Sequence, residues 1–264
     1  MNDREVNLIF DLEFFFNLSP DLLCIAGFDG YFKKINPAVS KTLGYTQEEL
    51  FAKPIDSFVH ADDRQLTSNK RKLLTKNSPL LNFENRYISK TGEIVWLTWT
   101  SMPVKEQELV FAIAKNITHG KRFEEYKRIS VVMSKHEHHA GMEGEPSTIA
   151  NSELSVIDQD WLNQIDLLIR KFIGKTELNI TWLSKEMAVS ERQLFRHTKA
   201  VTGVTPNKFI RVICLQLAME AINSGKYSTV SEIALAAGFK TPAYFNKLFK
   251  DVYLHDVGEL LNHR

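Results

Sequence analysis

The sequence has little cysteine, no long hydrophobic run and almost no net charge. Its 264 residues include only two cysteines, Cys24 and Cys214. These fall in different predicted domains, so we expect no disulfide framework and a reducing environment. No apolar run is long enough for a transmembrane helix, and the polar, charged N-terminus is unlike a signal peptide. The sequence therefore predicts a cytoplasmic protein without a membrane partner.

Signatures of common enzyme and metal chemistry are missing as well. We find no glycine-rich phosphate loop, no paired metal-ligand motif and no nucleophile–base combination. The cluster His136, His138 and His139 lacks the four-residue helical spacing and a supporting cysteine. It lies in residues 134–153, whose Gly, Pro, Ser and charged residues are typical of a flexible linker. We therefore expect a non-enzyme, without catalytic residues or a metal, built as two domains joined by this linker.

One pattern of apolar and basic residues occurs twice in the C-terminal half. Three residues recur 51 positions later with matching chemistry: Leu194, Arg196 and Lys199 correspond to Phe245, Lys247 and Lys250. Ser190 and Thr241 precede the two copies as predicted helix caps. A short amphipathic helix is expected before each copy, at 180–188 and 228–237, and a long helix at 205–224 between them. The repeat therefore predicts two helix-turn-helix units on one connecting helix.

Residues 160–264 resemble the C-terminal DNA-binding domain of AraC-type transcription regulators. The matching stretches are SERQLFR (190–196), TGVTP (202–206), A-x-x-A-I-N-S-G (218–225) and SEIALAAGF-x-x-x-AYFNKLFK (231–250). The resemblance implies that both units enter the major groove, one helical turn apart on one face of the DNA. The chain departs from the family pattern at Thr198, where a core Phe is usual, at Cys214, where Arg is usual, and over residues 254–260.

The predicted DNA contacts follow from the chemistry of the exposed positions. A helix of about 20 residues is about 30 Å long, close to the spacing of about 34 Å between successive major grooves. Residues 177–250 hold ten Lys and Arg but five Asp and Glu, whereas the whole chain has a net charge of +1. Arg196 suits guanine, Asn246 suits adenine, and Lys247 suits guanine or phosphate. The complete predicted set is Arg192, Gln193, Arg196, Lys199, Lys240, Thr241, Ala243, Asn246, Lys247 and Lys250.

Strand-like runs alternate with short helical ones in the N-terminal half. Asp29-Gly30 predicts a hairpin between strands at 21–28 and 31–37. Three further strands are expected at 80–89, 94–104 and 109–117, after helices at 38–43, 46–52 and 62–75. The predicted fold class is therefore α+β: an antiparallel five-stranded sheet with helices on one face, then an all-α domain.

This order of elements resembles a PAS sensor domain. The stretches that carry the resemblance are residues 19–50, HADD (60–63), FENRYISKTGEIVWLTW (83–99) and NIT (116–118). It implies a module that binds a small ligand, haem or flavin between sheet and helices, or that dimerises without one. Cys24 lies on the first strand, outside the helical motif that flavin photochemistry requires. His60 is expected to begin a helix rather than to serve as a haem ligand. We predict no cofactor and leave open a small-molecule ligand of unknown identity. Trp96 and Trp99 should face opposite sides of their strand. Core or dimer packing is the favoured role for either one, and lining a cavity is the alternative for one of them.

Apolar stripes lie on both sides of the predicted PAS domain. Their members are Val6, Ile9, Phe10 and Phe16 before it and Phe123, Tyr126, Ile129 and Met133 after it. Each is too short for an independent coiled coil, which leaves open packing across a dimer or capping of one protomer's sheet. The expected organisation is an N-terminal amphipathic helix (1–20), a PAS domain (21–119), a signalling helix and linker (120–157) and a DNA-binding domain (158–264).

Together these features predict a sequence-specific transcription regulator whose PAS domain senses a ligand or partner, dimerises, or does both. Its expected partners are promoter DNA, a second copy of the chain and, for an activator, RNA polymerase. The alternative is a PAS-based ligand- or partner-binding adaptor with a weak or vestigial DNA-binding domain. Thr198 and the irregular C-terminal end favour that alternative.

Overall fold

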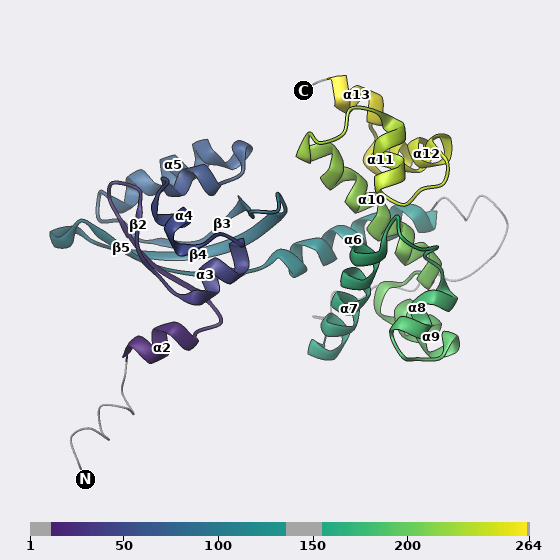
Figure 1. The fold of residues 1–264 in the computed structure, drawn as a ribbon, viewed down its shortest axis with the longest axis horizontal. Helices are drawn as coiled ribbons and strands as arrows, with labels where there is room; N and C mark the ends of the chain where they lie inside the picture. The colour runs from purple at the N-terminus through teal and green to yellow at the C-terminus, as the bar shows by residue number, and fades with distance from the viewer. Residues whose placement is uncertain (1–11, 136–154, 263–264) are drawn as a thin grey trace, which may run out of the picture. The chain divides into compact units, whose positions relative to one another are not determined.

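The computed structural model describes residues 12–135 and 155–262, and the chain divides into two compact units, Met1–Lys121 and Arg122–Arg264. Figure 1 shows a sheet with helices in the first and an arrangement of helices alone in the second. Within the described ranges, no helix combines the length and apolarity needed to cross a bilayer. The predicted linker histidines and most of the first apolar stripe lie outside the described residues.

A five-stranded antiparallel sheet organises the N-terminal unit. Its strands are β1 (Leu22–Gly27), β2 (Phe32–Ile35), β3 (Leu80–Ile88), β4 (Ile94–Val104) and β5 (Leu109–Asn116), in the order β2-β1-β5-β4-β3. All five predicted strands are present. The β1–β2 hairpin turns at Gly30, which has a φ of 90°, and the Asp29 carboxylate accepts the Tyr31 N–H at 3.1 Å. This is the conformation for which glycine is best suited, so the predicted hairpin is confirmed.

Helices cover one face of this sheet. They are α3 (Pro37–Leu43), α4 (Gln47–Phe51) and α5 (Ala61–Leu74), with short 3₁₀ turns η1 (Ile55–Phe58) and η2 (Lys105–Gln107), and α2 (Leu12–Leu18) precedes the sheet. Alternate strand residues such as Leu22, Leu97 and Ala114 are buried with Leu43 and Leu50 of the helices in one core. The side chains between them on the strands face the other way, as a two-residue period requires.

The C-terminal unit contains two helix-turn-helix motifs joined by a long helix. The first motif is α8 (Ile180–Glu186) and α9 (Glu191–Thr202); the second is α11 (Val230–Ala236) and α12 (Pro242–Tyr253). Between them runs α10 (Pro206–Ser224), and α6 (Thr118–Lys135), α7 (Val156–Phe172) and α13 (Val257–Asn262) complete the unit, although α6 begins in the other one. The predicted connecting helix is confirmed, because α10 starts at a proline and ends at Gly225 in the left-handed conformation.

Helices α9 and α12, the second helices of the two motifs, begin differently. The Ser190 hydroxyl caps α9 by accepting the backbone N–H of Gln193. The side-chain oxygen of Gln193 in turn accepts the backbone N–H of Ser190, and the two bonds form a capping box. Thr241 occupies the cap position of α12, but its side chain makes no capping bond. The predicted N-cap position of Thr241 is therefore confirmed, but its side chain supplies no capping bond. Pro242, at the start of the helix, has no backbone N–H that needs a partner.

The apolar stripe after the sheet has neither of its two expected locations. Tyr126, Ile129 and Met133 of α6 are buried in the core of the C-terminal unit, together with Ile165 of α7 and Phe209 of α10. They therefore do not cap the sheet, and they are covered already within a single chain. Sequence periodicity identifies an apolar face but does not identify its partner.

Candidate nucleic-acid interface

Helices α9 and α12 expose matching triads of residues. On α9, Arg192, Arg196 and Lys199 are exposed; on α12, the positions 51 residues later are Ala243, Lys247 and Lys250, also exposed. Spacings of four and three residues place each triad on one helical face. None of the five basic members forms a salt bridge with another described residue. Both triads are therefore free to meet an anionic partner.

The opposite faces of the same helices are buried. Leu194 and Thr198 of α9 correspond to Phe245 and Phe249 of α12, and all four are inaccessible to solvent. The departure at Thr198 is therefore a smaller side chain at a core position, where its hydroxyl is buried and has no hydrogen-bond partner among the residues that the structure describes. Cys214 is also buried, on α10. Neither departure changes the exposed triads.

Three other predicted contacts have partners within the protein. The Gln193 amide oxygen accepts bonds from the Ser190 backbone N–H at 3.1 Å and its hydroxyl at 2.9 Å. Lys240 lies 2.7 Å from Glu177 and lowers the pKa of that carboxyl by a hydrogen bond. Both partners are exposed, and because an exposed ion pair contributes little, a phosphate can replace Glu177. The third such residue, Asn246, is more firmly held.

Asn246 connects α12 to the beginning of α13. Its amide nitrogen donates to Asp256 at 2.9 Å, and its amide oxygen accepts the Val257 N–H at 3.3 Å. Both hydrogen-bonding groups of the side chain are thus engaged. Reading of adenine by Asn246 stays a prediction, and it would require these bonds to break.

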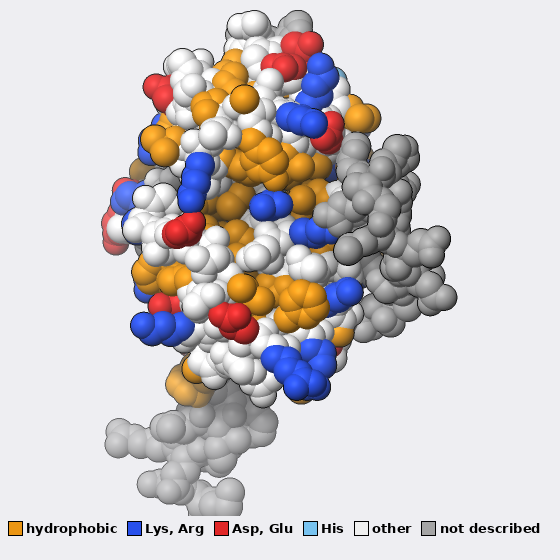
Figure 2. All heavy atoms as spheres, turned by 90° about the vertical axis from the view of Figure 1, so that its right-hand side faces the viewer, with side chains coloured by type: hydrophobic (Ala, Val, Ile, Leu, Met, Phe, Trp, Pro, Cys, Tyr) orange, Lys and Arg blue, Asp and Glu red, His pale blue; other side chains and the backbone are white. Residues whose placement is uncertain are grey.

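A groove of about 810 Å³ lies between the two motifs; the predicted DNA contacts Lys240 and Thr241 line it, and its other lining residues were not predicted. It is lined by the α7–α8 loop, the first half of α10 and the turn before α12, including Lys175, Asn207 and Arg211. The Arg211 guanidinium lies over the ring of Tyr244, 5.8 Å from its centroid. In the sequence, the signal for this groove was Arg211, a charged residue among the apolar residues of α10. Figure 2 shows Lys and Arg side chains beside hydrophobic ones on one side of the molecule.

The N-terminal unit contains a small cavity of about 70 Å³ between sheet and helices. Trp99 lines it and donates its indole N–H to Asn85 at 3.0 Å, whereas Trp96 lies on the other side of β4, under Lys121. The expectation that the two tryptophans face opposite sides is therefore confirmed, and Trp99 both belongs to the core and lines the cavity. His60 is the N-cap of α5 and is not among the lining residues. No group of three or more His, Cys, Asp or Glu within residues 12–135 and 155–262 is arranged to hold a metal ion.

Comparisons with known proteins match each unit separately. A family model described as "Helix-turn-helix domain" matches residues 183–262, and one described as "PAS fold" matches residues 32–115. The HTH-type transcriptional regulator MtrA of Neisseria gonorrhoeae is 34% identical over 104 residues, which are 38% of this chain and 34% of MtrA. Histidine kinase P4 of Formosa agariphila is 33% identical over 104 residues, 39% of this chain and 8% of that protein. This chain thus spans only a minor part of either curated relative.

Solved structures include similar sensor domains. A domain of the sensory box sensor histidine kinase/response regulator from Geobacter sulfurreducens is 19% identical and covers 42% of this chain and 97% of that one, with a TM-score of 0.37. The PAS domain of an HTR-like protein from Haloarcula marismortui is 22% identical over 43% of this chain and 95% of that one, also with a TM-score of 0.37. The two family models agree with the observed elements: the chain carries a PAS fold over residues 32–115 and a helix-turn-helix domain over residues 183–262.

Proposed function

We propose that this chain is a transcription regulator that reads promoter DNA with α9 and α12 and senses through its PAS fold. The observation that carries the proposal is the pair of exposed triads, Arg192–Arg196–Lys199 and Ala243–Lys247–Lys250, on helices joined by α10. The 19 residues of α10 correspond to about 28 Å of helix, which suits adjacent major grooves about 34 Å apart. The two helices then contact one face of the duplex together.

The test begins with selection of a binding site from random duplex DNA by the full chain. Arg196→Ala or Lys247→Ala should then weaken the selected site by ~1–3 kcal/mol and relax its base preference at one position. Lys199→Ala should weaken all sequences alike and reduce the salt dependence of binding by about one unit of slope. Lys53→Ala, an exposed lysine of the PAS fold, is the control. Unaltered specific binding in both recognition variants would refute the groove assignment.

The alternative, an adaptor with a vestigial DNA-binding domain, rests on Thr198 and the atypical C-terminal end. The orphaned Thr198 hydroxyl is the observation in its favour. Against it, α13 forms and is held to α12 by Asn246. Footprinting decides between them, because protection of a site of about two helical turns at physiological salt is incompatible with a vestigial domain. Transcription in vitro from that site would test activation through RNA polymerase.

We also propose that the chain forms a homodimer through the PAS fold. The uncovered face of the sheet carries Met102, Phe111 and Ile113, which are 52%, 43% and 48% exposed, and Met102 and Phe111 pair across β4 and β5. Contiguous exposed apolar residues of this kind mark interaction surfaces. Phe111→Glu should convert the dimer to a monomer in sedimentation equilibrium, whereas Leu73→Glu on α5 should not. A monomeric wild type at micromolar concentration would reject this part of the proposal.

The cavity near Trp99 is the proposed ligand site of the sensor. Its volume of about 70 Å³ corresponds to a few water-sized groups, far less than the several hundred Å³ of typical cofactor pockets. The structure in this state therefore suits a small molecule with a few heavy atoms. Native mass spectrometry of the purified full chain tests this directly through the mass of any molecule that copurifies.

A further inference from the structure

Phe195 is a large apolar side chain on the basic face of α9. It is 41% exposed, whereas its neighbour Leu194 is fully buried. Its position relative to Arg192, Arg196 and Lys199 follows the helical spacing i, i+3, i+4 and i+7, so all four side chains lie on one side of the helix. Single exposed apolar residues are common on protein surfaces. A phenyl ring among three cations, on a helix proposed to enter DNA, calls for a more specific explanation.

The stability of the fold does not account for this ring. Among the described residues, the core of the C-terminal unit includes Leu194 but not Phe195, which is also absent from the partly buried residues packed against it. The Lys199 ammonium lies over the ring, 6.0 Å from its centroid. A cation–π contact between exposed groups contributes little to stability. The side chain at position 195 is therefore available for a partner outside the protein.

Helix α9 presents the ring from a well-supported position. The helix packs against α8 and α10. Its buried side includes Leu194 and Thr198, both inaccessible to solvent. The His197 ring lies against Trp161 of α7, with centroids 4.4 Å apart. Helix α9 thus contacts α7, α8 and α10 within the same unit.

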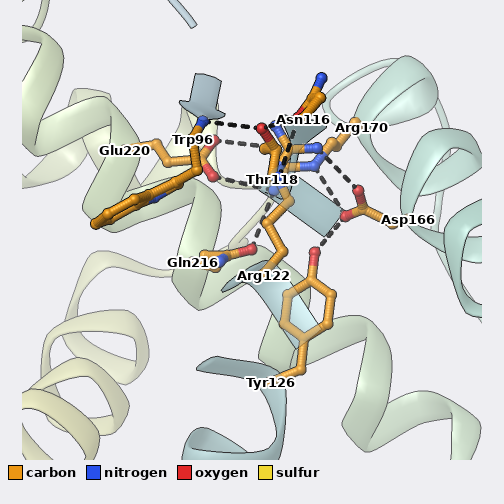
Figure 3. Close-up of polar contacts among 9 residues, drawn as sticks. All are labelled: Trp96, Asn116, Thr118, Arg122, Tyr126, Asp166, Arg170, Gln216 and Glu220. Carbon is orange, nitrogen blue, oxygen red and sulfur yellow. Dashed lines mark hydrogen bonds and ion pairs between the residues drawn. The ribbon is translucent and has the colours of Figure 1, made fainter. Parts of the chain in front are cut away.

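A buried polar network holds α7 to α6 and α10 (Figure 3). The Tyr126 hydroxyl donates to the Asp166 carboxylate, which is 2% exposed and also accepts from Arg170 Nε at 2.8 Å. The terminal nitrogens of Arg170 donate to Glu220 of α10 at 2.7 and 3.0 Å. Contacts that read a base require a helix held by fixed neighbours, because small displacements lose them. The support of α9 meets this requirement.

The equivalent position on α12 carries a different chemistry. Asn246 lies 51 residues after Phe195. Its amide nitrogen and oxygen are both engaged, with Asp256 and with the Val257 N–H. The repeat of basic residues therefore does not extend to this position, where α9 offers an apolar ring and α12 an amide bound to α13. The two motifs are built to recognise different sequences here.

We propose that Phe195 determines specificity by contacting the C5-methyl group of a thymine in the part of the DNA site bound by α9, the α9 half-site. Among the base edges of the major groove, thymine alone presents an apolar methyl group, and phenylalanine is one of the side chains that contact it. Phe195 lies in the first half of α9, the part of such a helix that meets base edges. The inference rests on the proposed function, because it requires α9 to enter the major groove.

The test removes the methyl group from the DNA and the ring from the protein. The full chain binds the duplex selected from random sequences, and Arg196→Ala locates the α9 half-site by the position where base preference relaxes. Each thymine of that half-site is then replaced by deoxyuridine, which lacks only the C5-methyl group. One replacement should weaken binding by the wild type about fourfold, the effect of exposing one buried methyl group. The same replacement should have almost no effect on Phe195→Ala.

A second arm adds the methyl group to another base. At the same position, a cytosine·guanine pair is compared with its 5-methylcytosine counterpart. The methyl group should strengthen binding by the wild type about fourfold and leave Phe195→Ala unchanged. Leu167→Ala is the matched control, because it shortens a 57% exposed apolar side chain of α7 and should retain the full dependence on the methyl group.

Three results would overturn the proposal. In the first, no thymine of the α9 half-site depends on its methyl group. In the second, the wild type and Phe195→Ala depend on it equally. In the third, Phe195→Ala binds DNA like the wild type but supports less transcription in vitro, which would assign the ring to a protein partner. Failure of both Arg196→Ala and Lys247→Ala to alter specific binding would instead refute the proposed function, so the two failures are distinguishable.

Discussion

The amide nitrogen of Asn246, on the second recognition helix, donates a hydrogen bond to the Asp256 carboxylate 2.9 Å away. Its amide oxygen accepts the Val257 N–H at the start of α13. Asn246, which was predicted to read adenine, therefore links α12 to α13 through these two hydrogen bonds. The observed structural role of Asn246 and its predicted DNA-reading role have different experimental consequences.

Asn246→Ala is expected to lower the free energy of unfolding of the C-terminal unit by ~1 kcal/mol, because two hydrogen bonds are lost at a half-buried site. Urea denaturation measures this change. On the selected DNA site, an unchanged base preference in this variant would restrict Asn246 to its structural role. Relaxed preference at one adenine with unchanged stability would instead support direct reading by Asn246.

The same pair predicts an acid dependence. The hydrogen bond from Asn246, followed by that from the Gly258 N–H, lowers the pKa of Asp256 below its usual value. A carboxyl with a lowered folded-state pKa contributes stability above its unfolded value, and the contribution is lost as the pH falls through the folded value. Wild type should therefore lose slightly more stability than Asn246→Ala between about pH 5 and about pH 3. Parallel pH profiles of unfolding for the two proteins would contradict this.

Leu254 ends α12 in the left-handed conformation, with a φ of 63°. Its side chain is 82% exposed, so it gains little from packing. Leu254→Gly should therefore raise the free energy of unfolding by up to ~1 kcal/mol through relief of backbone strain. Leu235→Gly is the matched control, since Leu235 is 72% exposed but lies within α11. This variant should lower the free energy of unfolding by about the same amount, because glycine is unfavourable inside a helix. Thermal unfolding should show opposite shifts for the two variants.

Thr198 and Thr202 offer a second matched pair on α9. The Thr198 hydroxyl is buried without a partner, whereas the Thr202 hydroxyl donates to the Thr198 carbonyl oxygen at 2.6 Å. Thr198→Val should be neutral or stabilise the unit by ~1 kcal/mol, because it removes an unsatisfied polar group with little change of shape. Thr202→Val should destabilise it by about the same amount. Equal effects in chemical denaturation would indicate that the Thr198 hydroxyl has a partner in solution.

The two cysteines should be unreactive in the folded chain. Burial raises the pKa of both the Cys24 and the Cys214 thiol to about 12, so almost no thiolate is present at neutral pH. Alkylation at about pH 8 followed by mass spectrometry should show slow labelling of the native chain and complete labelling in denaturant. Fast labelling of one cysteine would locate a region that opens locally.

Most of the fold follows from short-range information in the sequence. The hairpin at Asp29-Gly30, the period of two in β4 and the proline and glycine that bound α10 involve neighbours in the chain. The exposed triads of the candidate interface were likewise predictable, because the same spacing of basic and apolar residues occurs twice. Asn246 was predicted as a DNA contact from its residue type and Gln193 from its position on the helix, and neither reveals the intramolecular partners that the two side chains have.

By itself, the sequence determined the order of the elements, the division into a PAS fold and a helix-turn-helix domain, and the basic faces of α9 and α12. Local spacing, turn chemistry and a repeat at constant offset are sufficient for these features. Only the tertiary structure decided that Tyr126 of α6 is buried against Phe209 and Asp166, that Asn246 holds α13, and that Arg211 lines a groove. Each of these depends on contacts between residues separated along the chain, which an amphipathic pattern permits but does not specify.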